Sequence, residues 1–269
     1  MSISFCDRLR EAVSSAGCPI CVGLDPDPKL LPEHFGPSPE GCLRFLTEII
    51  AATCDLVPAY KPNSAFFEAY GSAGWSMLEK LRDLIGPQAL LILDAKRGDV
   101  EHTNAAYANA VFQHLKADAI TVHPYLGGGA LNPFMQDPAK GMFVLCVTSN
   151  PGAVSIQNLM LESHPLYIEV ARQAKHWSAY DNVGLVVGTT KPDALKSVLK
   201  VAPELPYLLP GSGAQGGTLK VTKDLKEAGS PYLLNFARSI LYASDGKDFA
   251  EAARSEVLRL RGVLEKSAD

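Results

Sequence analysis

The sequence lacks a long apolar run. No stretch approaches the roughly 18 consecutive apolar residues of a membrane-spanning helix. The first helical segment, residues 4–16, alternates apolar and charged residues and has none of the continuous apolar core typical of a secretory signal. These absences predict a cytoplasmic protein that does not enter a membrane.

An excess of positive charge is also missing. The 25 Lys and Arg residues are outnumbered by 29 Asp and Glu residues, which gives a formal net charge of -4. Proteins that bind nucleic acids or anionic membranes generally carry a basic excess. The composition therefore argues against both kinds of partner. It does not argue against a local basic pocket for a small anion.

The cysteines do not complete a metal or redox motif. Cys18 and Cys21, two of six cysteines, have the CxxC spacing. A zinc site needs further ligands, and neither a second CxxC nor a His-x-x-x-His pair is present. Because Cys21 opens an apolar run, we interpret both residues as small buried hydrophobic side chains and predict no metal.

What the chain does contain is a regular alternation of short apolar runs and longer amphipathic ones. Its 269 residues are close to the roughly 250 of a (β/α)8 barrel. Strands are expected at residues 20–24, 56–60, 90–93, 119–122, 142–147, 183–187, 207–209 and 232–234. Helices are expected at residues 42–54, 66–85, 100–115, 166–180, 193–201 and 218–228.

This alternation predicts an α/β fold, a single-domain (β/α)8 TIM barrel over residues 1–269. The barrel has an extra N-terminal helix and a C-terminal helical tail near residues 249–264. A doubly wound open sheet is the main alternative. We interpret the proline-dense stretch 26–39 and residues 149–165 as long loops, of which the second can act as a lid.

The third expected strand runs directly into a charged hexapeptide, residues 94–99. Asp94 and Lys96 are two residues apart on an extended segment, so they can share a face. Asp99 begins the next helix, and Thr103 follows one turn later, with Val100 expected on that helix's apolar face. A lysine between two carboxylates stays protonated. The alternative is a surface ion-pair cluster in which Asp99 is the helix N-cap.

Other strand ends carry polar residues, and barrel enzymes place their functional residues there. Asp25 is placed to accept hydrogen bonds from sugar hydroxyls, or is a turn residue. Lys61 lies at the barrel mouth or on the solvated surface, and His123 is a general base or a structural residue. Ser149 and Asn150 suit the edge of a planar heterocycle.

The last two strand ends predict a phosphate site. A glycine-rich loop, residues 211–217, precedes a helix, so that backbone N–H groups can approach an anion. Arg238 follows the eighth strand and has the geometry of a bidentate phosphate ligand.

These motifs together resemble the orotidine 5′-phosphate decarboxylase family. Asp94, Lys96 and Asp99 fit its Asp-x-Lys-x-x-Asp motif, with Thr103 four residues further on. Residues 210–217 are similar to the family's seventh loop. Residues 148–152 and the chain length resemble the longer bacterial (type 2) branch.

The resemblance implies a cofactor-free carboxy-lyase that converts orotidine 5′-phosphate to UMP and CO2 in de novo pyrimidine synthesis. Lys96 would be the proton donor, and Asp94, Asp99 and Lys61 would complete the charged array. The implied substrate contacts are Asp25 with the ribose, Ser149 with the pyrimidine, and Gln215 and Arg238 with the phosphate. It further implies a homodimer, in which Asp99 and Thr103 reach into the partner subunit's site.

Three alternatives stay open. A sugar-phosphate decarboxylase or hexulose-phosphate synthase of the same superfamily would share the motif but use magnesium. A Schiff-base aldolase would use Lys61 or Lys96 as a nucleophile, although the flanking carboxylates favour a protonated lysine. A nucleotide-binding barrel without catalytic activity would leave the charged hexapeptide unexplained.

Overall fold

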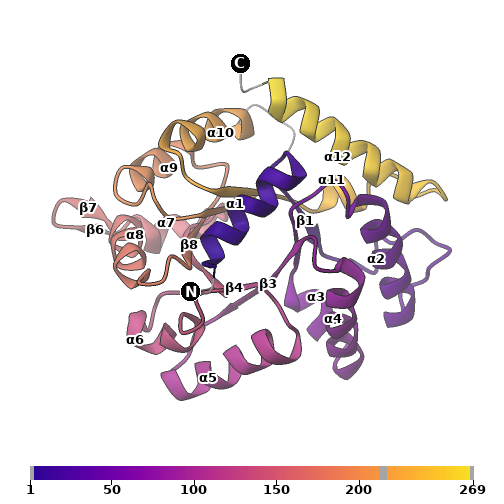
Figure 1. Ribbon diagram of the computed structural model, residues 1–269, viewed down its shortest axis with the longest axis horizontal. Helices are drawn as coiled ribbons and strands as arrows, with labels where there is room; N and C mark the ends of the chain where they lie inside the picture. The colour runs from indigo at the N-terminus through magenta and orange to yellow at the C-terminus, as the bar shows by residue number, and fades with distance from the viewer. Residues whose placement is uncertain (1–2, 212–216, 267–269) are drawn as a thin grey trace.

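The chain folds into a closed barrel of eight parallel strands surrounded by helices (Figure 1). The computed structural model describes residues 3–211 and 217–266, of which 217–220 are described by their backbone alone. The strands are β1 (Ile20–Leu24), β2 (Ala59–Pro62), β3 (Leu90–Arg97), β4 (Ala119–Val122), β5 (Gly141–Val147), β8 (Val183–Val187), β9 (Tyr207–Pro210) and β10 (Tyr232–Phe236). Because β1 pairs with both β2 and β10, the barrel prediction is confirmed and the open sheet is excluded.

Helices separate the strands and form the outer layer, as expected for parallel strands that are buried on both faces. They are α2 (Pro39–Thr53), α3 (Ser64–Glu68), α4 (Ser72–Ile85), α5 (Glu101–Asn109) with a π-helical turn at Ala110–His114, α6 (Gly127–Leu131), α8 (Leu166–Trp177), α9 (Pro192–Leu199), α10 (Gly217–Ala228), α11 (Arg238–Leu241) and α12 (Phe249–Lys266). The last of these is the predicted C-terminal tail.

Three predicted strands match their observed bounds, and two others differ in a way that matters for the site. β2 begins at Ala59 and continues to Pro62, so Lys61 lies within a strand. β3 extends to Arg97, so Asp94 and Lys96 also belong to a strand rather than to the loop after it. Apolar content ends at Leu93, which is why the sequence pattern placed the end of this strand too early.

The prediction of a single helix at residues 66–85 was wrong. Helix α3 ends at Glu68 and α4 begins at Ser72, with Gly71 between them at a φ of +59°. The two helices meet closely, because a Cβ atom on Gly74 would lie 1.7 Å from the carbonyl oxygen of Phe67. Only a glycine permits this approach, so the chain turns here instead of continuing one helix.

The long loop after β5 has secondary structure of its own. It contains a 3-10 turn (Pro151–Ala153), the short helix α7 (Val154–Gln157) and a hairpin of β6 (Met160–Leu161) with β7 (His164–Pro165). The Gln157 side chain accepts a hydrogen bond from the Thr148 N–H at 3.0 Å and donates one to the Thr148 hydroxyl at 2.9 Å. These bonds tie the loop to the end of β5.

The N-terminal helix α1 (Phe5–Ala16) covers one end of the barrel and crosses the middle of the view in Figure 1. Its Phe5 ring packs edge-on against Phe143 at 5.7 Å between centroids. Phe5 and Leu9 belong to the apolar cluster that fills the barrel interior with residues such as Ile92 and Leu208. The predicted N-terminal helix therefore closes the barrel at the amino ends of its strands.

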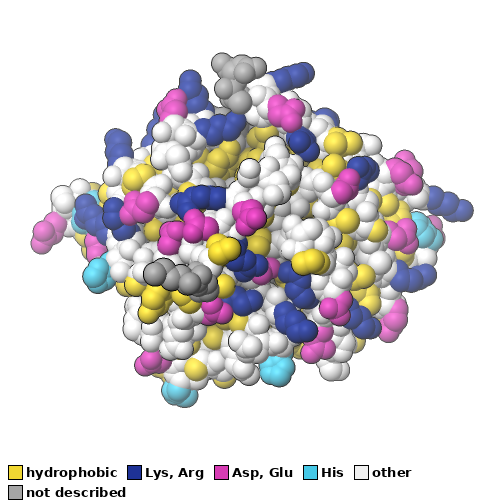
Figure 2. All heavy atoms as spheres, in the orientation of Figure 1, with side chains coloured by type: hydrophobic (Ala, Val, Ile, Leu, Met, Phe, Trp, Pro, Cys, Tyr) yellow, Lys and Arg dark blue, Asp and Glu magenta, His cyan; other side chains and the backbone are white. Residues whose placement is uncertain are grey.

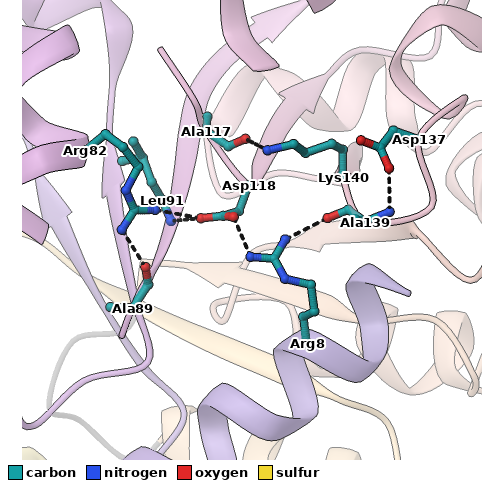
Figure 3. A network of polar contacts seen from close by, with 9 residues as sticks. All are labelled: Arg8, Arg82, Ala89, Leu91, Ala117, Asp118, Asp137, Ala139 and Lys140. Atoms are coloured by element: carbon teal, nitrogen blue, oxygen red, sulfur yellow. Dashed lines mark hydrogen bonds and ion pairs between the residues drawn. The ribbon is translucent and has the colours of Figure 1, made fainter. Parts of the chain in front are cut away.

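A buried carboxylate fixes this helix to the barrel (Figure 3). Asp118 accepts hydrogen bonds from Arg8 of α1 at 2.6 Å and from Arg82 of α4 at 2.9 Å. It also accepts one from the Leu91 N–H at 2.9 Å. Asp118 is 6% exposed, so its charge is balanced within the protein by two guanidinium groups.

The helices, the surface charges and the cysteines can be compared with what the composition predicts. None of the described helices is long and apolar enough to cross a membrane. On the face shown in Figure 2, acidic and basic side chains are interspersed rather than gathered into a patch of one sign. All six cysteines are free thiols, and Cys18 and Cys21 are buried as expected.

Candidate active site

The candidate site begins where the inward-facing residues of three neighbouring strands change from apolar to polar. On β2 Ala59 is followed by Lys61, and on β4 Ala119 is followed by Thr121, each two residues further along. On β3, Asp94 lies two residues beyond Ile92. Ala59, Ile92 and Ala119 belong to the interior apolar cluster. Because side chains alternate along a strand, the polar residues form the next layer toward the carboxyl ends.

Asp94 lies between two lysines. Its Oδ2 atom accepts a hydrogen bond from Lys61 Nζ at 2.6 Å, and its Oδ1 atom accepts one from Lys96 Nζ at 2.6 Å. The hydroxyl of Thr121 donates a third bond to Oδ1 at 2.8 Å. Asp94 and Lys96 thus share a face as predicted. Within the described part of the chain, Asp99 makes no ion pair with Lys96, so the carboxylate, not the lysine, is the central group.

The surrounding charges favour the ionised forms of Asp94 and Lys61. Burial raises the pKa of Asp94, but the Lys61 and Lys96 ammonium groups outweigh it and hold that pKa well below its usual range. Burial lowers the pKa of Lys61, and the Asp94 and Asp25 carboxylates more than offset it, so that the net shift is upward.

The two lysines differ in access to solvent. The Lys61 side chain is 3% exposed, so the alternative of a solvated surface lysine was wrong. The Lys96 side chain is 46% exposed. It is the accessible member of the charged array that Lys61, Asp94 and Lys96 form. A ligand at the barrel mouth can therefore reach Lys96 directly, whereas Lys61 is enclosed and contacts Asp94 from within the barrel.

Asp99 is held through its backbone. The buried Asn104 accepts a hydrogen bond from the Asp99 N–H at 3.1 Å and donates one to the Asp99 carbonyl at 2.7 Å. The N-cap of α5 is Val100 rather than Asp99, so the capping alternative was wrong. Val100 is 46% exposed, which also corrects its expected place on the apolar face. Thr103 is half-buried on the first turn of α5.

A second region of the site is a cavity of about 660 Å³ beside β1 and β10. Asp25, Asn235, Arg238 and Tyr242 line it, and Gly211, at a φ of +83°, marks the start of the predicted phosphate loop. Residues 212–216, including Gln215, lie outside the described residues. The structure thus brings together Asp25 and Arg238, which are far apart in the sequence.

Asp25 connects this cavity to the charged array. Its Oδ1 atom accepts a hydrogen bond from the Asn63 N–H at 3.2 Å, and Asn63 forms a backbone bridge with Asp94. Burial raises the pKa of Asp25, with the Lys61 charge opposing that effect. The Tyr242 hydroxyl donates to the Asp25 carbonyl at 3.1 Å.

The guanidinium of Arg238 is exposed at the first residue of α11. Among the described residues it forms no ion pair, whereas most arginines of the chain pair with a carboxylate. An uncommitted guanidinium on the cavity wall is available to an anionic ligand.

Ser149 and His123 lie at neighbouring strand ends. Ser149 is exposed just after β5, beside Thr148, whose hydroxyl donates to Asn150 Oδ1 at 2.6 Å. His123 Nε2 lies 3.0 Å from the carbonyl oxygen of Gly98. His123 therefore holds the backbone just before Asp99, which favours the structural interpretation over a general base.

Sequence reasoning missed Thr121 and Asn104. Both are buried polar side chains, 1% and 0% exposed. A signal existed for Thr121, because it is the one polar residue in the apolar run 119–122 and lies at the strand end. Asn104 gave no such signal, and one of its hydrogen bonds is a tertiary contact with the Ala130 carbonyl, which the sequence pattern does not contain.

The chain is similar to known proteins over most of its length. The sequence model of the orotidine 5′-phosphate decarboxylase / HUMPS family matches residues 19–253. The chain belongs to this family. The match extends from just before β1 into α12 and so includes the barrel, Asp94, Lys96 and Arg238.

Individual relatives are similar over nearly their whole length. Orotidine 5′-phosphate decarboxylase of Roseiflexus sp. (strain RS-1) is 49% identical over 91% of this chain and 91% of its own. That of Thermomicrobium roseum is 48% identical over 98% and 96%. The solved structure of Leishmania donovani OMP decarboxylase superposes with a TM-score of 0.81 at 38% identity, over 97% of this chain and 99% of that one.

Proposed function

We propose that this decarboxylase-family chain converts orotidine 5′-phosphate to UMP and CO2 without a cofactor, as the last step of de novo pyrimidine synthesis in the cytoplasm. The observation that carries the proposal is the half-exposed Lys96 ammonium, bound to Asp94 at 2.6 Å. Asp25 joins this pair to a cavity whose wall carries Arg238, a guanidinium that forms no ion pair with any described residue. A fixed cation next to an anion site suits a reaction that forms a carbanion on a phosphate ester.

The proposed step breaks the bond between C6 and the carboxylate carbon. The electron pair stays on C6, CO2 leaves, and Lys96 Nζ transfers a proton to C6. The resulting amine regains its proton from water. Because the ring offers this carbanion little resonance relief, a preorganised ammonium group at C6 is the main available source of stabilisation.

Asp94 and Lys61 prepare Lys96 for this role. The Asp94 carboxylate binds the Lys96 ammonium at 2.6 Å and restricts its position, and the Lys61 ammonium balances the remaining charge of Asp94. Asp94 would also lie near the departing carboxylate and repel it in the ground state. The transition-state contribution of the ammonium does not depend on that repulsion.

The rest of the nucleotide would be bound by residues around the cavity. Asp25 would accept hydrogen bonds from the ribose hydroxyls, Ser149 would contact the pyrimidine, and Arg238 with Gln215 would bind the phosphate. Phosphate binding is remote from C6, yet its energy can order the site for the transition state.

The proposed enzyme is a homodimer with shared sites. Asp99 makes no ion pair with the Lys96 of its own chain among the described residues, although it follows closely in the sequence. We infer that Asp99 and Thr103 act in the partner subunit's site, where Asp99 would add a second carboxylate beside the partner's lysine.

The arrangement around Asp94 favours this reaction over a magnesium-dependent one. Both carboxylate oxygens already accept hydrogen bonds from ammonium groups at 2.6 Å. A divalent cation at the same oxygens would be repelled by both lysines. A Schiff-base aldolase is also disfavoured, because its nucleophile is a free amine, whereas Lys96 Nζ is bound to Asp94 Oδ1 at 2.6 Å.

The direct test is the loss of orotidine 5′-phosphate absorbance when purified protein is added. Turnover should continue in excess EDTA, and borohydride should trap no covalent adduct in the presence of the nucleotide. Turnover that disappears with EDTA and returns with Mg²⁺ would support the magnesium-dependent alternative instead.

A further inference from the structure

Thr121 is a buried polar residue that belongs to neither the charged hexapeptide nor the nucleotide-binding residues proposed above. It lies on β4, directly opposite the charged end of β3, and is 1% exposed. Its hydroxyl donates a hydrogen bond to Asp94 Oδ1 at 2.8 Å and accepts one from the Lys96 backbone N–H at 3.0 Å. One side chain therefore holds both residues of the Asp94–Lys96 pair.

The backbone of β3 explains why such a residue is needed. The pairing with β4 shifts between Leu93 and Arg97, so β3 bulges at the functional residues. Lys96 has a φ of +48°, in the left-handed region that residues with a Cβ atom rarely adopt. A bulge removes backbone groups from the ladder and re-aims side chains. The Thr121 hydroxyl supplies the acceptor that the bulged Lys96 N–H would otherwise lack.

Two of these three contacts converge on one atom, and the third joins the same residues. Asp94 Oδ1 receives the Thr121 hydroxyl and the Lys96 ammonium, and the same hydroxyl receives the Lys96 N–H. This closed set of hydrogen bonds fixes the Lys96 main chain and the tip of its side chain relative to the same carboxylate oxygen.

We propose that Thr121 is a positioning residue for proton delivery, which holds the strained backbone of Lys96 and orients Asp94 so that the ammonium remains at the reacting carbon. The activity readout for this role rests on the proposed function. Thr121 acts through Lys96 and Asp94 and does not itself touch the nucleotide.

The test compares Thr121→Val, which keeps the shape and removes the hydroxyl, with Thr121→Ser, which keeps the hydroxyl. A displacement of about 1 Å in a reacting group can lower a rate about 100-fold. We expect Thr121→Val to lower kcat for orotidine 5′-phosphate by about 10- to 100-fold. KM and the affinity for UMP, measured by calorimetry, should remain close to those of the parent enzyme. Thr121→Ser should restore most of kcat.

Thr53→Val is the matched control. Thr53 is fully buried on α2, and its hydroxyl donates to the Ile49 carbonyl at 2.7 Å, away from the charged array. This variant should lose thermal stability without losing kcat. If Thr121→Val does not fold, Thr121→Ala provides the same comparison. Equal kcat in Thr121→Val and the parent would overturn the proposal, as would an equal loss of kcat in Thr121→Ser or Thr53→Val.

Crystal structures can test the role of Thr121 independently of the proposed function. If the parent enzyme leaves orotidine 5′-phosphate unchanged, the proposed function fails, and crystal structures of the parent and Thr121→Val still decide the role of Thr121. In the variant, Lys96 should leave the left-handed region or its Nζ should leave Asp94 Oδ1. An unchanged Lys96 in both respects would overturn the positioning role.

Discussion

At the scale of single residues, the site depends on how charge is shared around Asp94. Three donors converge on its carboxylate, two of them ammonium groups at 2.6 Å. Lys61 is enclosed and cannot leave this pair, whereas Lys96 is half-exposed and can face a ligand. Burial thus places the same residue type for two different proposed roles.

Replacing Lys96 tests the proposed proton donor. Lys96→Ala should lower kcat by at least about 10⁴-fold, because it removes both the proton and the charge that stabilises the carbanion. UMP should still bind measurably, since the phosphate and ribose contacts lie elsewhere. Stopped assays of orotidine 5′-phosphate consumption and calorimetry with UMP measure the two effects. Near-normal decarboxylation would remove Lys96 from the mechanism.

Replacing Arg238 tests the proposed phosphate site. Arg238→Ala should weaken UMP binding by about 2–3 kcal/mol, the size of charge-assisted hydrogen bonds to a phosphate. Uridine, which lacks the phosphate, should bind the variant and the parent about equally. Competition assays with both ligands make the comparison. Equal losses for UMP and uridine would contradict a phosphate role.

At the scale of elements, the two ends of the barrel are stabilised by different means. The carboxyl ends of β2, β3 and β4 carry the polar layer, and β3 bulges between Leu93 and Arg97, where Asp94 and Lys96 lie. The amino ends are closed by α1, which is fixed by the ion pairs of Asp118. The ion pairs that fix α1 and the residues of the proposed chemistry therefore lie at opposite ends of the same strands.

This separation predicts the behaviour of Asp118→Ala. The change leaves two guanidinium groups and the Leu91 N–H without their shared partner. We expect the free energy of unfolding to fall by about 2–4 kcal/mol, with kcat of the folded enzyme unchanged. Urea denaturation followed by circular dichroism measures the loss.

Asp55→Ala is the control for Asp118→Ala. Asp55 pairs with Arg254 at 2.6 Å, but its side chain is 58% exposed. Exposed ion pairs contribute little to stability, so its loss should be much smaller. If both variants lost stability equally, the burial of Asp118 would not be the cause.

At the scale of the whole molecule, closure of the barrel assembles the site. β1 lies between β2 and β10, with Gly23 opposite Lys61 and Val22 opposite Phe236. Asp25, at the end of β1, is thereby placed between the charged array and the cavity that Arg238 lines. An open sheet would leave β1 and β10 at separate edges, so the site depends on closure.

The proposed sharing of sites between two subunits predicts complementation. Lys96→Ala and Asp99→Ala enzymes should each be nearly inactive alone. In a mixed dimer, one site would combine an intact Lys96 with the partner's intact Asp99. Random mixing in equal amounts should restore activity at about a quarter of all sites. Activity of mixtures after subunit exchange measures this, and no recovery despite proven mixed dimers would contradict shared sites.

Much of the fold could be predicted because burial leaves a direct trace in the sequence. The runs 20–24, 119–122 and 183–187 coincide with β1, β4 and β8, since parallel strands covered on both faces are continuously apolar. The end of β3 and the break between α3 and α4 could not be predicted in this way. The first continues through charged residues, and the second depends on the contact between Gly74 and Phe67.

The sequence by itself determined the barrel, the position of Asp94, Lys96 and Arg238 at strand ends, and the family, because these follow from local periodicity and motif spacing. Only the tertiary structure decided that Asp94 is the centre of the array, that Lys61 is buried beneath it, and that Thr121 joins Asp94 to Lys96. Those facts depend on which strands are neighbours, on a bulge in their register and on burial, and none of these is a local property of the chain.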